Sequence, residues 1–397
     1  MHPSALLEPG SPVCATDWSH TATQAMATGQ WHGAWCALLD ASLPAPLAAQ
    51  QHILAALDQW DALPATAPMH QRQQVLEAAL GALQAAHASV RVEAPACAVH
   101  HAAGTGLVKR FARGGFTLGP VDVQVPPGHI LGLVGENGNG KTTLLRLLAG
   151  DLAPDAGTLD WGAPQRDPYG LRSQLAYIPQ RPHQWGGRLM DHLQYAARSH
   201  GLSGPSNRSM VELVIARLSL RAFRGHQWKQ LSSGYKMRFE LARALLTRPR
   251  VLLLDEPLAN LDINAQQTLL SDLRSLARSP WHPIAMVLSS QQLYEVEKVA
   301  DAVLFLENGQ PRNLSERFAQ MAGCAVEFET AWTTPALLDW LHHLPEHTRQ
   351  VNGHTHIVSF AADFPAAQFL RQAVDAHMPL GYFRDITGST RRLFVKD

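Results

Sequence analysis

The segment Gly135–Thr142 reads GENGNGKT, and it decides the fold. It matches the pattern GxxxxGK[ST], in which glycines let backbone N–H groups turn inward around phosphate oxygens. An apolar stretch, Ile130–Val134, precedes it, and a helical pattern over Thr143–Leu148 follows it. The order of glycines does not fit GxGxxG, so a dinucleotide site is not indicated. Strand, loop and helix in this order predict a phosphate-binding loop, with Lys141 reaching the β- and γ-phosphates and Thr142 holding Mg²⁺.

Two carboxylates follow a second apolar stretch. Val251–Leu254 reads VLLL, as in a strand buried on both faces of a parallel sheet, and Asp255 and Glu256 come directly after it. Ligands of open α/β sheets bind at the carboxyl ends of the strands. Read alone, two adjacent acids could merely cap the next helix, but beside a phosphate loop they favour catalysis. Asp255 is then expected to bind Mg²⁺, and Glu256 to act as general base on the attacking water.

The stretch Leu231–Tyr235 reads LSSGY and lies between these two motifs. In isolation, a Ser/Gly turn before a helical pattern is a common N-cap. In this position it resembles LSGGQ, the signature of the ABC (ATP-binding cassette) superfamily. The resemblance implies that it faces the γ-phosphate held by a second subunit. Ser232 and Gly234 match the contacting positions of the signature, whereas Ser233 and Tyr235 depart from its consensus.

Further resemblances to the family fall in the expected order along the chain. Gln180, which follows the letters YIP, resembles the Q-loop residue that senses Mg²⁺ and water and couples to a membrane partner. Asp262 ends the letters ANLD, which resemble the D-loop facing the second subunit. Phe111 resembles the aromatic residue that stacks on adenine; Phe116 is a weaker candidate, and a core role for either is the alternative. Gln291 stands where the family usually has a switch histidine.

The resemblance implies a site for ATP and Mg²⁺. The residues assigned to catalysis are Glu256, Gln291, Gln180 and Lys141. The residues assigned to Mg²⁺ are Thr142, Gln180 and Asp255. The residues assigned to the nucleotide are Phe111, Gly135, Glu136, Asn137, Gly138, Asn139, Gly140, Lys141, Thr142, Thr143, Gln180, Ser232, Ser233, Gly234, Asp255 and Asp262.

The composition excludes several classes of protein. The chain has 397 residues, 46% of them hydrophobic, which suits two or three globular domains. Its formal net charge is zero, which argues against a protein that coats nucleic acid or anionic lipid. The cysteines, Cys14, Cys36, Cys97 and Cys324, form no CxxC pair, and histidine pairs such as His100-His101 lack i, i+4 spacing, so no zinc site is expected. No apolar run is long enough to span a bilayer, and the N-terminus lacks a secretory pattern.

Composition divides the chain into residues 1–102, 103–318 and 319–397. In the first part, apolar spacing near 3.6 residues predicts about three helices in a small bundle, with the tryptophans in its core rather than in a ligand groove. The middle part alternates apolar strands with helical stretches, as a parallel α/β sheet does. The last part reads as a smaller α/β unit. Its strands are expected at Ala325–Glu329, His356–Phe360 and Tyr382–Ile386, and its helices, each with proline in the first turn, at Pro335–Leu344 and Pro365–Ala376.

The expected fold is therefore an α/β P-loop NTPase of the ABC ATPase type, with a helical N-terminal extension of unknown function and a small C-terminal α/β domain. Each motif occurs once, unlike in two-cassette translation factors. No heptad pattern separates Lys141 from Ser232, unlike in relatives that carry a coiled-coil arm. Arg384–Thr387 and Ser389–Phe394 resemble the tail of ABC-2 exporter ATPases.

The resemblance implies an ATP-hydrolysing subunit of an ABC transporter, most similar to an ABC-2 exporter. It would drive a separate membrane permease, supplied in trans, by ATP-dependent closure of a dimer, and the second ATPase subunit is expected to be an identical copy. Its expected place is the cytoplasm, on the cytoplasmic face of the cell membrane, with no nucleic acid as partner. The alternative is a soluble regulatory ABC ATPase that is not attached to a transporter.

Overall fold

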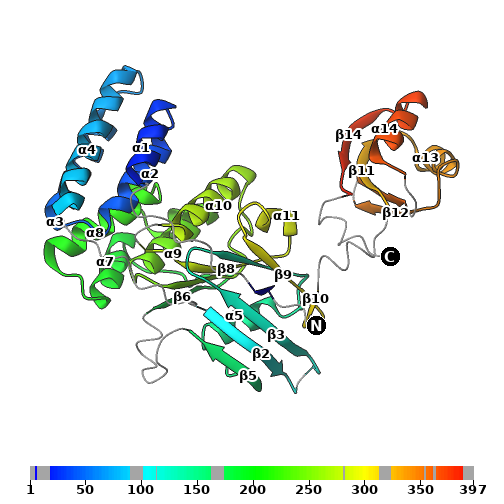
Figure 1. Cartoon of the computed structure of the whole chain (residues 1–397), viewed down its shortest axis with the longest axis horizontal. Coiled ribbons are helices and arrows are strands. Elements are labelled where there is room, and N and C mark those ends of the chain that lie inside the picture. The colour runs from blue at the N-terminus through cyan, green and yellow to red at the C-terminus, as the bar shows by residue number, and fades with distance from the viewer. Residues whose placement is uncertain are drawn as a thin grey trace.

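The computed structural model describes residues 5–6, 18–89, 102–112, 114–161, 174–279, 282–312, 323–352, 355–360 and 364–387. Figure 1 shows three groups of elements: helices near the N-terminus, a central α/β body, and a small α/β unit near the C-terminus. The tail motif Ser389–Phe394, the pair His100-His101, and Cys14 and Cys97 lie outside the described residues.

The central body is built on a six-stranded sheet in the order β10-β9-β4-β8-β7-β6. Its parallel strands are β4 (Ile130–Val134), β6 (Leu175–Ile178), β7 (Val251–Leu254), β8 (Ala285–Ser290) and β9 (Ala302–Glu307). The edge strand β10 (Gln310–Arg312) runs antiparallel to β9. Both faces of β7 are buried, because Leu252 and Leu254 enter one hydrophobic core while Val251 and Leu253 enter another. The predicted parallel α/β sheet is thus confirmed.

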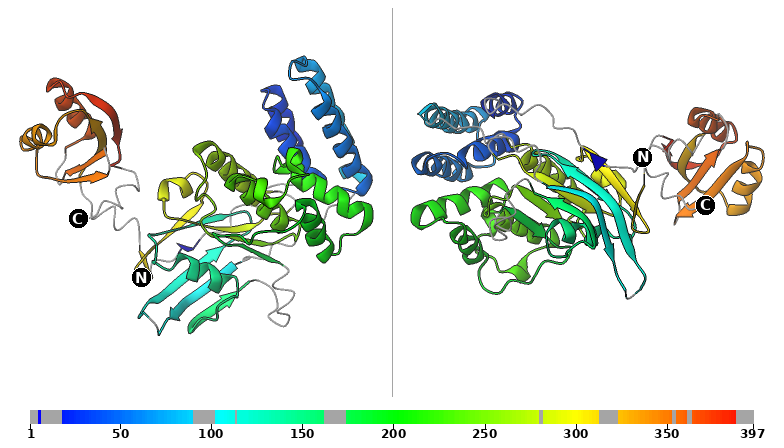
Figure 2. Two further views of the ribbon diagram at one scale, coloured as in Figure 1. Left: turned by 180° about the vertical axis from the view of Figure 1, so that it is seen from behind. Right: turned by 60° about the horizontal axis from the view of Figure 1, so that its bottom comes forward.

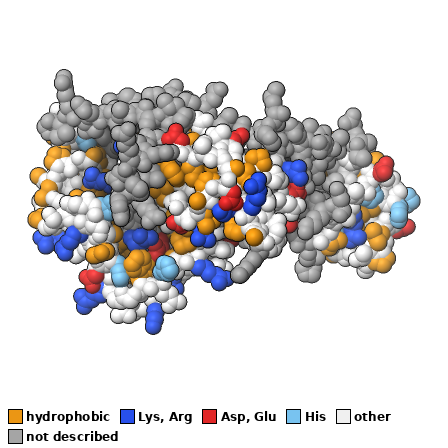
Figure 3. Space-filling view, turned by 90° about the horizontal axis from the view of Figure 1, so that it is seen from below, with side chains coloured by type: hydrophobic (Ala, Val, Ile, Leu, Met, Phe, Trp, Pro, Cys, Tyr) orange, Lys and Arg blue, Asp and Glu red, His pale blue; other side chains and the backbone are white. Residues whose placement is uncertain are grey.

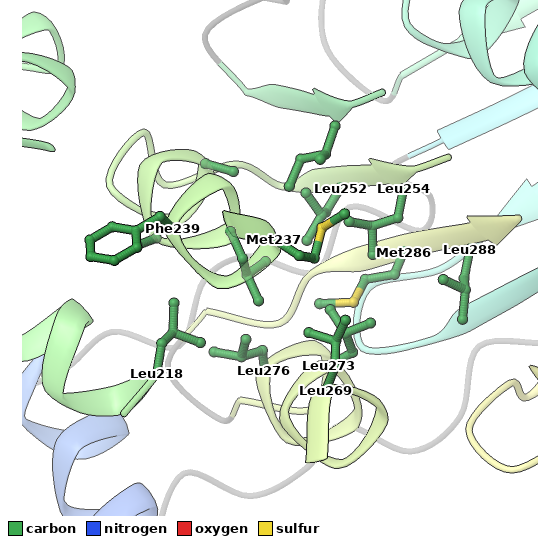
Figure 4. Close-up of a cluster of buried hydrophobic side chains, with 14 of the residues drawn as sticks. Leu218, Met237, Phe239, Leu252, Leu254, Leu269, Leu273, Leu276, Met286 and Leu288 are labelled. Carbon is green, nitrogen blue, oxygen red and sulfur yellow. The ribbon is translucent and has the colours of Figure 1, made fainter. Parts of the chain in front are cut away.

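Helices cover one face of this sheet. They are α7 (Leu189–Ser199), α8 (Gly204–Arg217), α9 (Ser233–Leu245), α10 (Ile263–Ala277) and α11 (Leu293–Val296), with two short 3₁₀ turns, η1 (Arg221–Phe223) and η2 (Trp228–Gln230). Figure 4 shows leucine and methionine side chains of β7 and β8 meeting those of α9 and α10. This packing fixes the start of α9 and of α10 relative to the carboxyl ends of the strands.

The other face carries α5 and a second sheet. Helix α5 (Lys141–Leu148) shares its core with the strands of a four-stranded sheet in the order β1-β3-β2-β5. The strands are β1 (Ala5–Leu6), β2 (Ala102–Arg110), β3 (Thr117–Val125) and β5 (Ala156–Asp160). Leu144 and Leu148 of α5 and Val121 of β3 are buried together in this core. Helix α5 is thereby held with its first turn at the end of β4.

The N-terminal part holds four helices in the described residues, rather than about three. They are α1 (Trp18–Ala27), α2 (Trp31–Ser42), α3 (Leu47–Ala62) and α4 (Met69–Ser89). Pro46 is the N-cap of α3, consistent with the fixed φ of proline at helix starts. Trp35 is buried and meets the Trp60 ring edge-on, with centroids 5.7 Å apart. The predicted core role is confirmed for Trp35, whereas Trp31 is partly buried and packs against the same core.

These helices pack against α8 of the central body, as Figures 1 and 2 show from different sides. Leu213 of α8 is fully buried in the same core as the N-terminal helices. One turn later, Arg217 donates from Nε to Asp40 of α2 over 2.7 Å and from Nη1 to Asp272 of α10 over 3.2 Å. Burial alone would lower the pKa of Arg217, but the two carboxylates raise it overall, so the guanidinium stays charged.

The C-terminal unit is a four-stranded antiparallel sheet in the order β12-β13-β11-β14, with two helices. Its elements are β11 (Ala325–Thr330), α13 (Thr334–Leu341), β12 (His347–Asn352), β13 (Thr355–Phe360), α14 (Ala366–Asp375) and β14 (Leu380–Asp385). The chain order βαββαβ is that of the ferredoxin-like motif. Strand β12 was not predicted, because HTRQVN has no apolar alternation. Pro335 lies in the first turn of α13, but Pro365 is the N-cap of α14 rather than part of its first turn.

Two surface properties bear on function. Within the residues that the structure describes, no helix combines the length and the apolar character needed to cross a bilayer. On the face drawn in Figure 3, basic and acidic side chains are interspersed with apolar ones. This mixture agrees with the zero net charge of the sequence.

Candidate nucleotide-binding site

The loop between β4 and α5 has the conformation of a phosphate-binding nest. Gly138 and Gly140 have φ values of 86° and 97°, which L residues rarely adopt. A Cβ on Gly135 would lie 2.4 Å from the carbonyl oxygen of Leu306, so the loop also needs glycine where it passes β9. Helix α5 begins at Lys141, and its first N–H groups therefore point into the loop.

Lys141 closes this loop from the inside. Its ammonium donates to the carbonyl oxygen of Gly135 over 2.7 Å and to that of Glu136 over 3.2 Å. Only 5% of the Lys141 side chain is exposed. The tip of the loop, Glu136 to Gly138, is exposed. A buried ammonium beneath a ring of backbone N–H groups is a site that suits a polyphosphate.

Asn139 ties the loop to the turn between β9 and β10. Its Oδ1 accepts a hydrogen bond from the backbone N–H of Asn308 over 3.1 Å. Asn308 has a positive φ of 50°, which asparagine tolerates better than most residues. Nothing in the sequence pattern marked Asn308, because the contact joins segments far apart in the chain.

Asp255, directly after β7, is held by three hydroxyl groups. Thr142 Oγ1 and Ser289 Oγ each donate to it over 2.8 Å, and the Tyr177 hydroxyl lies 3.3 Å from it. Burial and the neighbouring Asp255 charge raise the pKa of Tyr177, so the phenol stays a donor. Thr142 and Asp255 offer adjacent hard oxygen ligands, the kind that Mg²⁺ prefers. Ser289 and Tyr177 were not assigned to the site from the sequence.

Glu256 is the point where the other polar residues converge. Its Oε2 accepts from Gln180 Nε2 over 2.6 Å and from Gln291 Nε2 over 2.8 Å, and its Oε1 lies 3.4 Å from the Lys141 ammonium. The backbone N–H of Glu256 donates to Ser289 Oγ over 2.8 Å. Glu256 also has a positive φ of 48°, a costly conformation for a non-glycine residue. Four residues assigned to catalysis therefore meet at one carboxylate.

The Leu231–Tyr235 turn makes its hydrogen bonds away from the phosphate loop and Glu256. Ser232 is the N-cap of α9, with its Oγ 3.5 Å from the Tyr235 N–H, and Ser233 Oγ donates to the carbonyl oxygen of Asn260 over 2.7 Å. The Tyr235 ring packs on Phe223 with centroids 3.9 Å apart, which accounts for an aromatic residue at this position. These hydrogen bonds are made to α9 and to the Asn260 turn, not to the phosphate loop.

Asp262 is the N-cap of α10. Its Oδ1 accepts from the Ala265 N–H over 2.9 Å, so its conformation has a structural explanation. Next to it, Ile263 is 72% exposed.

Phe116 lies against the phosphate loop, and Phe111 lies next to Phe116. The Phe111 and Phe116 rings have centroids 6.3 Å apart, and the Phe111 N–H donates to the Phe116 carbonyl oxygen. A Cβ on Gly140 would come within 3.0 Å of Phe116 Cζ, so Phe116 packs directly on the loop. Both rings are partly exposed. Phe116 therefore supports the loop, which leaves Phe111 as the candidate for stacking on a base.

Comparisons with known proteins match the central part of the chain. The family model described as "ABC transporter" matches residues 118–259. The chain is 30% identical over 258 residues to the Fe(3+) ions import ATP-binding protein FbpC of Photorhabdus laumondii, covering 60% of this chain and 71% of that protein. It is 33% identical over 262 residues to the Nod factor export ATP-binding protein I of Paraburkholderia xenovorans, covering 64% and 84%.

A solved structure shows the same fold. The structure of cbiO1 from Clostridium perfringens, described as part of the ABC transporter complex cbiONQ, superimposes with a TM-score of 0.50 at 22% identity. The match covers 56% of this chain and 91% of that one.

Proposed function

This chain belongs to the ABC transporter family of ATP-binding proteins, and we propose that it is the ATP-hydrolysing subunit of an exporter of the ABC-2 type. It is an ABC-type ATPase, and subunits of this kind work with a membrane permease. Its α/β fold is that of the family. Relatives that import and relatives that export both match it, so the direction of transport is part of the proposal.

The convergence on Glu256 is the observation that carries the catalytic part of the proposal. Lys141 would bind the β- and γ-phosphates of ATP, and Thr142, Asp255 and Gln180 would hold Mg²⁺ directly or through water. Glu256 accepts the proton of the attacking water as general base. In the structure Lys141 lies 3.4 Å from Glu256, so an incoming phosphate would compete for the ammonium and free the carboxylate.

The placement of the signature turn supports a dimer. Ser232 and Gly234 lie at the N-terminus of α9 and bind to no phosphate loop of their own chain. Two copies facing each other would bring each signature turn, and the adjacent Asp262, to the ATP bound by the other copy. The γ-phosphate then bridges the copies, and its hydrolysis releases them. ATP shifts this equilibrium by its higher affinity for the closed dimer.

We further propose that residues 1–102, 103–318 and 319–397 act as an N-terminal extension, the ATPase domain and a C-terminal domain. The C-terminal unit and the resemblance of Arg384–Thr387 to exporter tails support export. The Nod factor export protein, matched over 84% of its length, points the same way. The proposed location is the cytoplasmic face of the membrane, where ATP is available.

The decisive experiment identifies a multi-span membrane protein among the products of the genes that neighbour this one and pairs the chain with it. We expect vesicles containing that protein to bind the chain and to raise its ATP turnover relative to empty vesicles of the same lipids. Lys141→Ala, which lacks the phosphate-binding ammonium, should bind the same vesicles without turnover. An ATP turnover that is the same with these vesicles and with empty vesicles would favour a regulatory ATPase without a permease. Normal ATP turnover in Lys141→Ala would contradict the proposed ATP site.

A further inference from the structure

Three potential metal ligands meet where the N-terminal helices contact the central body. His32 and Cys36 lie one turn apart on α2, and Asp272 comes from α10. One ligand atom from each residue lies within 4.8 Å of the other two. We propose that these side chains form a binding site for a thiophilic divalent cation such as Zn²⁺. This site is separate from the ATP site.

The distance between the first two ligands fits a shared ion. His32 Nε2 and Cys36 Sγ are 3.6 Å apart. With Zn–S and Zn–N bonds of about 2.3 and 2.0 Å, a tetrahedral angle places the two ligand atoms about 3.5 Å apart. The i, i+4 spacing puts both side chains on one face of α2, as in helix-borne metal pairs. The expectation of no zinc site rested on CxxC and His–His spacings, which do not include a mixed His–Cys pair.

The Asp272 carboxylate has lone pairs available for a metal bond. It is buried, its Oδ1 accepts from Arg217, and its Oδ2 lies 3.6 Å from Arg238. An ionised carboxylate has about four lone-pair positions, so these contacts leave room for a metal bond. Asp40 pairs with the same Arg217 over 2.7 Å. Two carboxylates thus offset two guanidinium groups, and the cation does not enter a cluster of net positive charge.

A cleft of about 470 Å³ gives access to the three ligands. It is wide enough for water to complete a tetrahedral site with three protein ligands. Two further arginines line it, but Arg274 donates to the Lys298 carbonyl oxygen and Arg278 to Asp301. Their charges are therefore directed away from the ligands.

The competing interpretation is a simple thiol–imidazole hydrogen bond within one helix. That hydrogen bond corresponds to the 3.6 Å contact between His32 Nε2 and Cys36 Sγ. A bound cation would join α2 to α10 and stabilise the docking of the N-terminal helices, which a hydrogen bond inside α2 cannot do.

The test is titration of the reduced, untagged full-length chain with Co²⁺, which reports a thiolate ligand by an intense near-ultraviolet charge-transfer band. We expect one Co²⁺ per chain and displacement of the band by Zn²⁺. Cys36→Ser should abolish the band. His32→Ala, at an exposed position that should not disturb folding, should weaken Co²⁺ binding by about tenfold or more.

The matched control carries Cys14→Ser, Cys97→Ser and Cys324→Ser together and keeps Cys36 as its sole cysteine. This control should retain the band, and Zn²⁺ should raise its midpoint of thermal unfolding while leaving that of Cys36→Ser unchanged. A parent chain without the band, or a band that persists in Cys36→Ser, overturns the proposal. Neither readout uses ATP turnover, so the metal site and the proposed transport function fail independently.

Discussion

Gln291 donates from its Nε2 to Glu256 Oε2 across 2.8 Å. The same oxygen accepts from Gln180 over 2.6 Å, so two neutral amides fix one carboxylate oxygen. The resemblance to the ABC family implies a histidine at the position of Gln291. An amide can donate to a phosphate oxygen as imidazole does, but it cannot become cationic. We therefore infer that Gln291 positions Glu256 and the γ-phosphate without adding a titrating group.

Replacing Gln291 tests this inference. Gln291→Ala should lower steady-state ATP turnover by a factor of about ten to a hundred, since a hydrogen bond to a charged group contributes about 1.5–3 kcal/mol. Gln291→His should raise turnover and add a pH dependence near the imidazole pKa. Gln292→Ala, at the exposed neighbouring position, is the control and should behave as the parent. If Gln291→Ala also hydrolyses ATP at the parent rate, Gln291 has no catalytic role.

Glu256→Gln should bind ATP but not hydrolyse it. The amide keeps the shape of the side chain and removes the proposed base, so a closed dimer should accumulate with Mg-ATP. Size-exclusion chromatography measures the dimer, and phosphate release measures turnover. Glu297→Gln, the same substitution at an exposed position, should hydrolyse ATP at the parent rate and should not accumulate a dimer. A Glu256→Gln chain that stays monomeric would contradict the proposed sandwich.

Phe111→Ala should weaken ATP and GTP binding by similar factors. Stacking contributes about 0.5–1.5 kcal/mol and carries no hydrogen-bond code, so a loss of about two- to tenfold is expected. Phe116→Ala removes the ring that supports Gly140 and should lower the midpoint of thermal unfolding as well. Fluorescent-nucleotide titration and thermal unfolding separate the two effects. A larger loss of affinity in Phe116→Ala, at unchanged stability, would move the adenine contact to Phe116.

Arg217→Met should destabilise the chain strongly. It leaves the buried carboxylate of Asp40 without its cation, which typically costs about 3–5 kcal/mol, and leaves Asp272 with only its 3.6 Å contact to Arg238. The control is Arg221→Met, whose partners Asp58 and Asp61 are 70% and 56% exposed. Exposed pairs contribute about 0–1 kcal/mol. Denaturant unfolding of the full chain measures the free energy of unfolding of both variants. Equal losses would contradict a larger contribution from the buried Arg217 ion pairs.

His282 should make stability depend on pH. Burial lowers its pKa below the usual value, and its Nε2 lies 2.9 Å from the Pro249 carbonyl oxygen. Below about pH 6.5 the unfolded chain binds a proton that the folded chain does not, so the free energy of unfolding falls as pH falls. This loss continues until the pH reaches the lowered pKa of the folded state. His282→Gln should flatten the slope of stability against pH in that window, whereas exposed His200→Gln should not.

Local patterns were sufficient for much of the fold. The phosphate loop, β7 and the start of α9 could be predicted because each depends on consecutive residues. The roles of Ser289, Tyr177 and Asn308 could not, because each contacts a segment far away in the chain. Strand β12 was missed because its pairing with β13, not its own apolar pattern, makes it a strand. The burial of Leu213 was also missed, because only the assembled N-terminal helices cover it.

The Arg217 contacts have a mechanical consequence. The Arg217 guanidinium of α8 bonds to both α2 and α10. Because α8 is thereby tied to α2, a tilt of α8 would move the N-terminal helices with it. Figure 1 shows α1 and α4 extending away from α8. Helix α4 has 21 residues. At 1.5 Å per residue it is about 30 Å long, so a tilt of about 5° at one end moves the other by about 3 Å. A small tilt of α8 would therefore become a larger displacement at the far ends of the N-terminal helices.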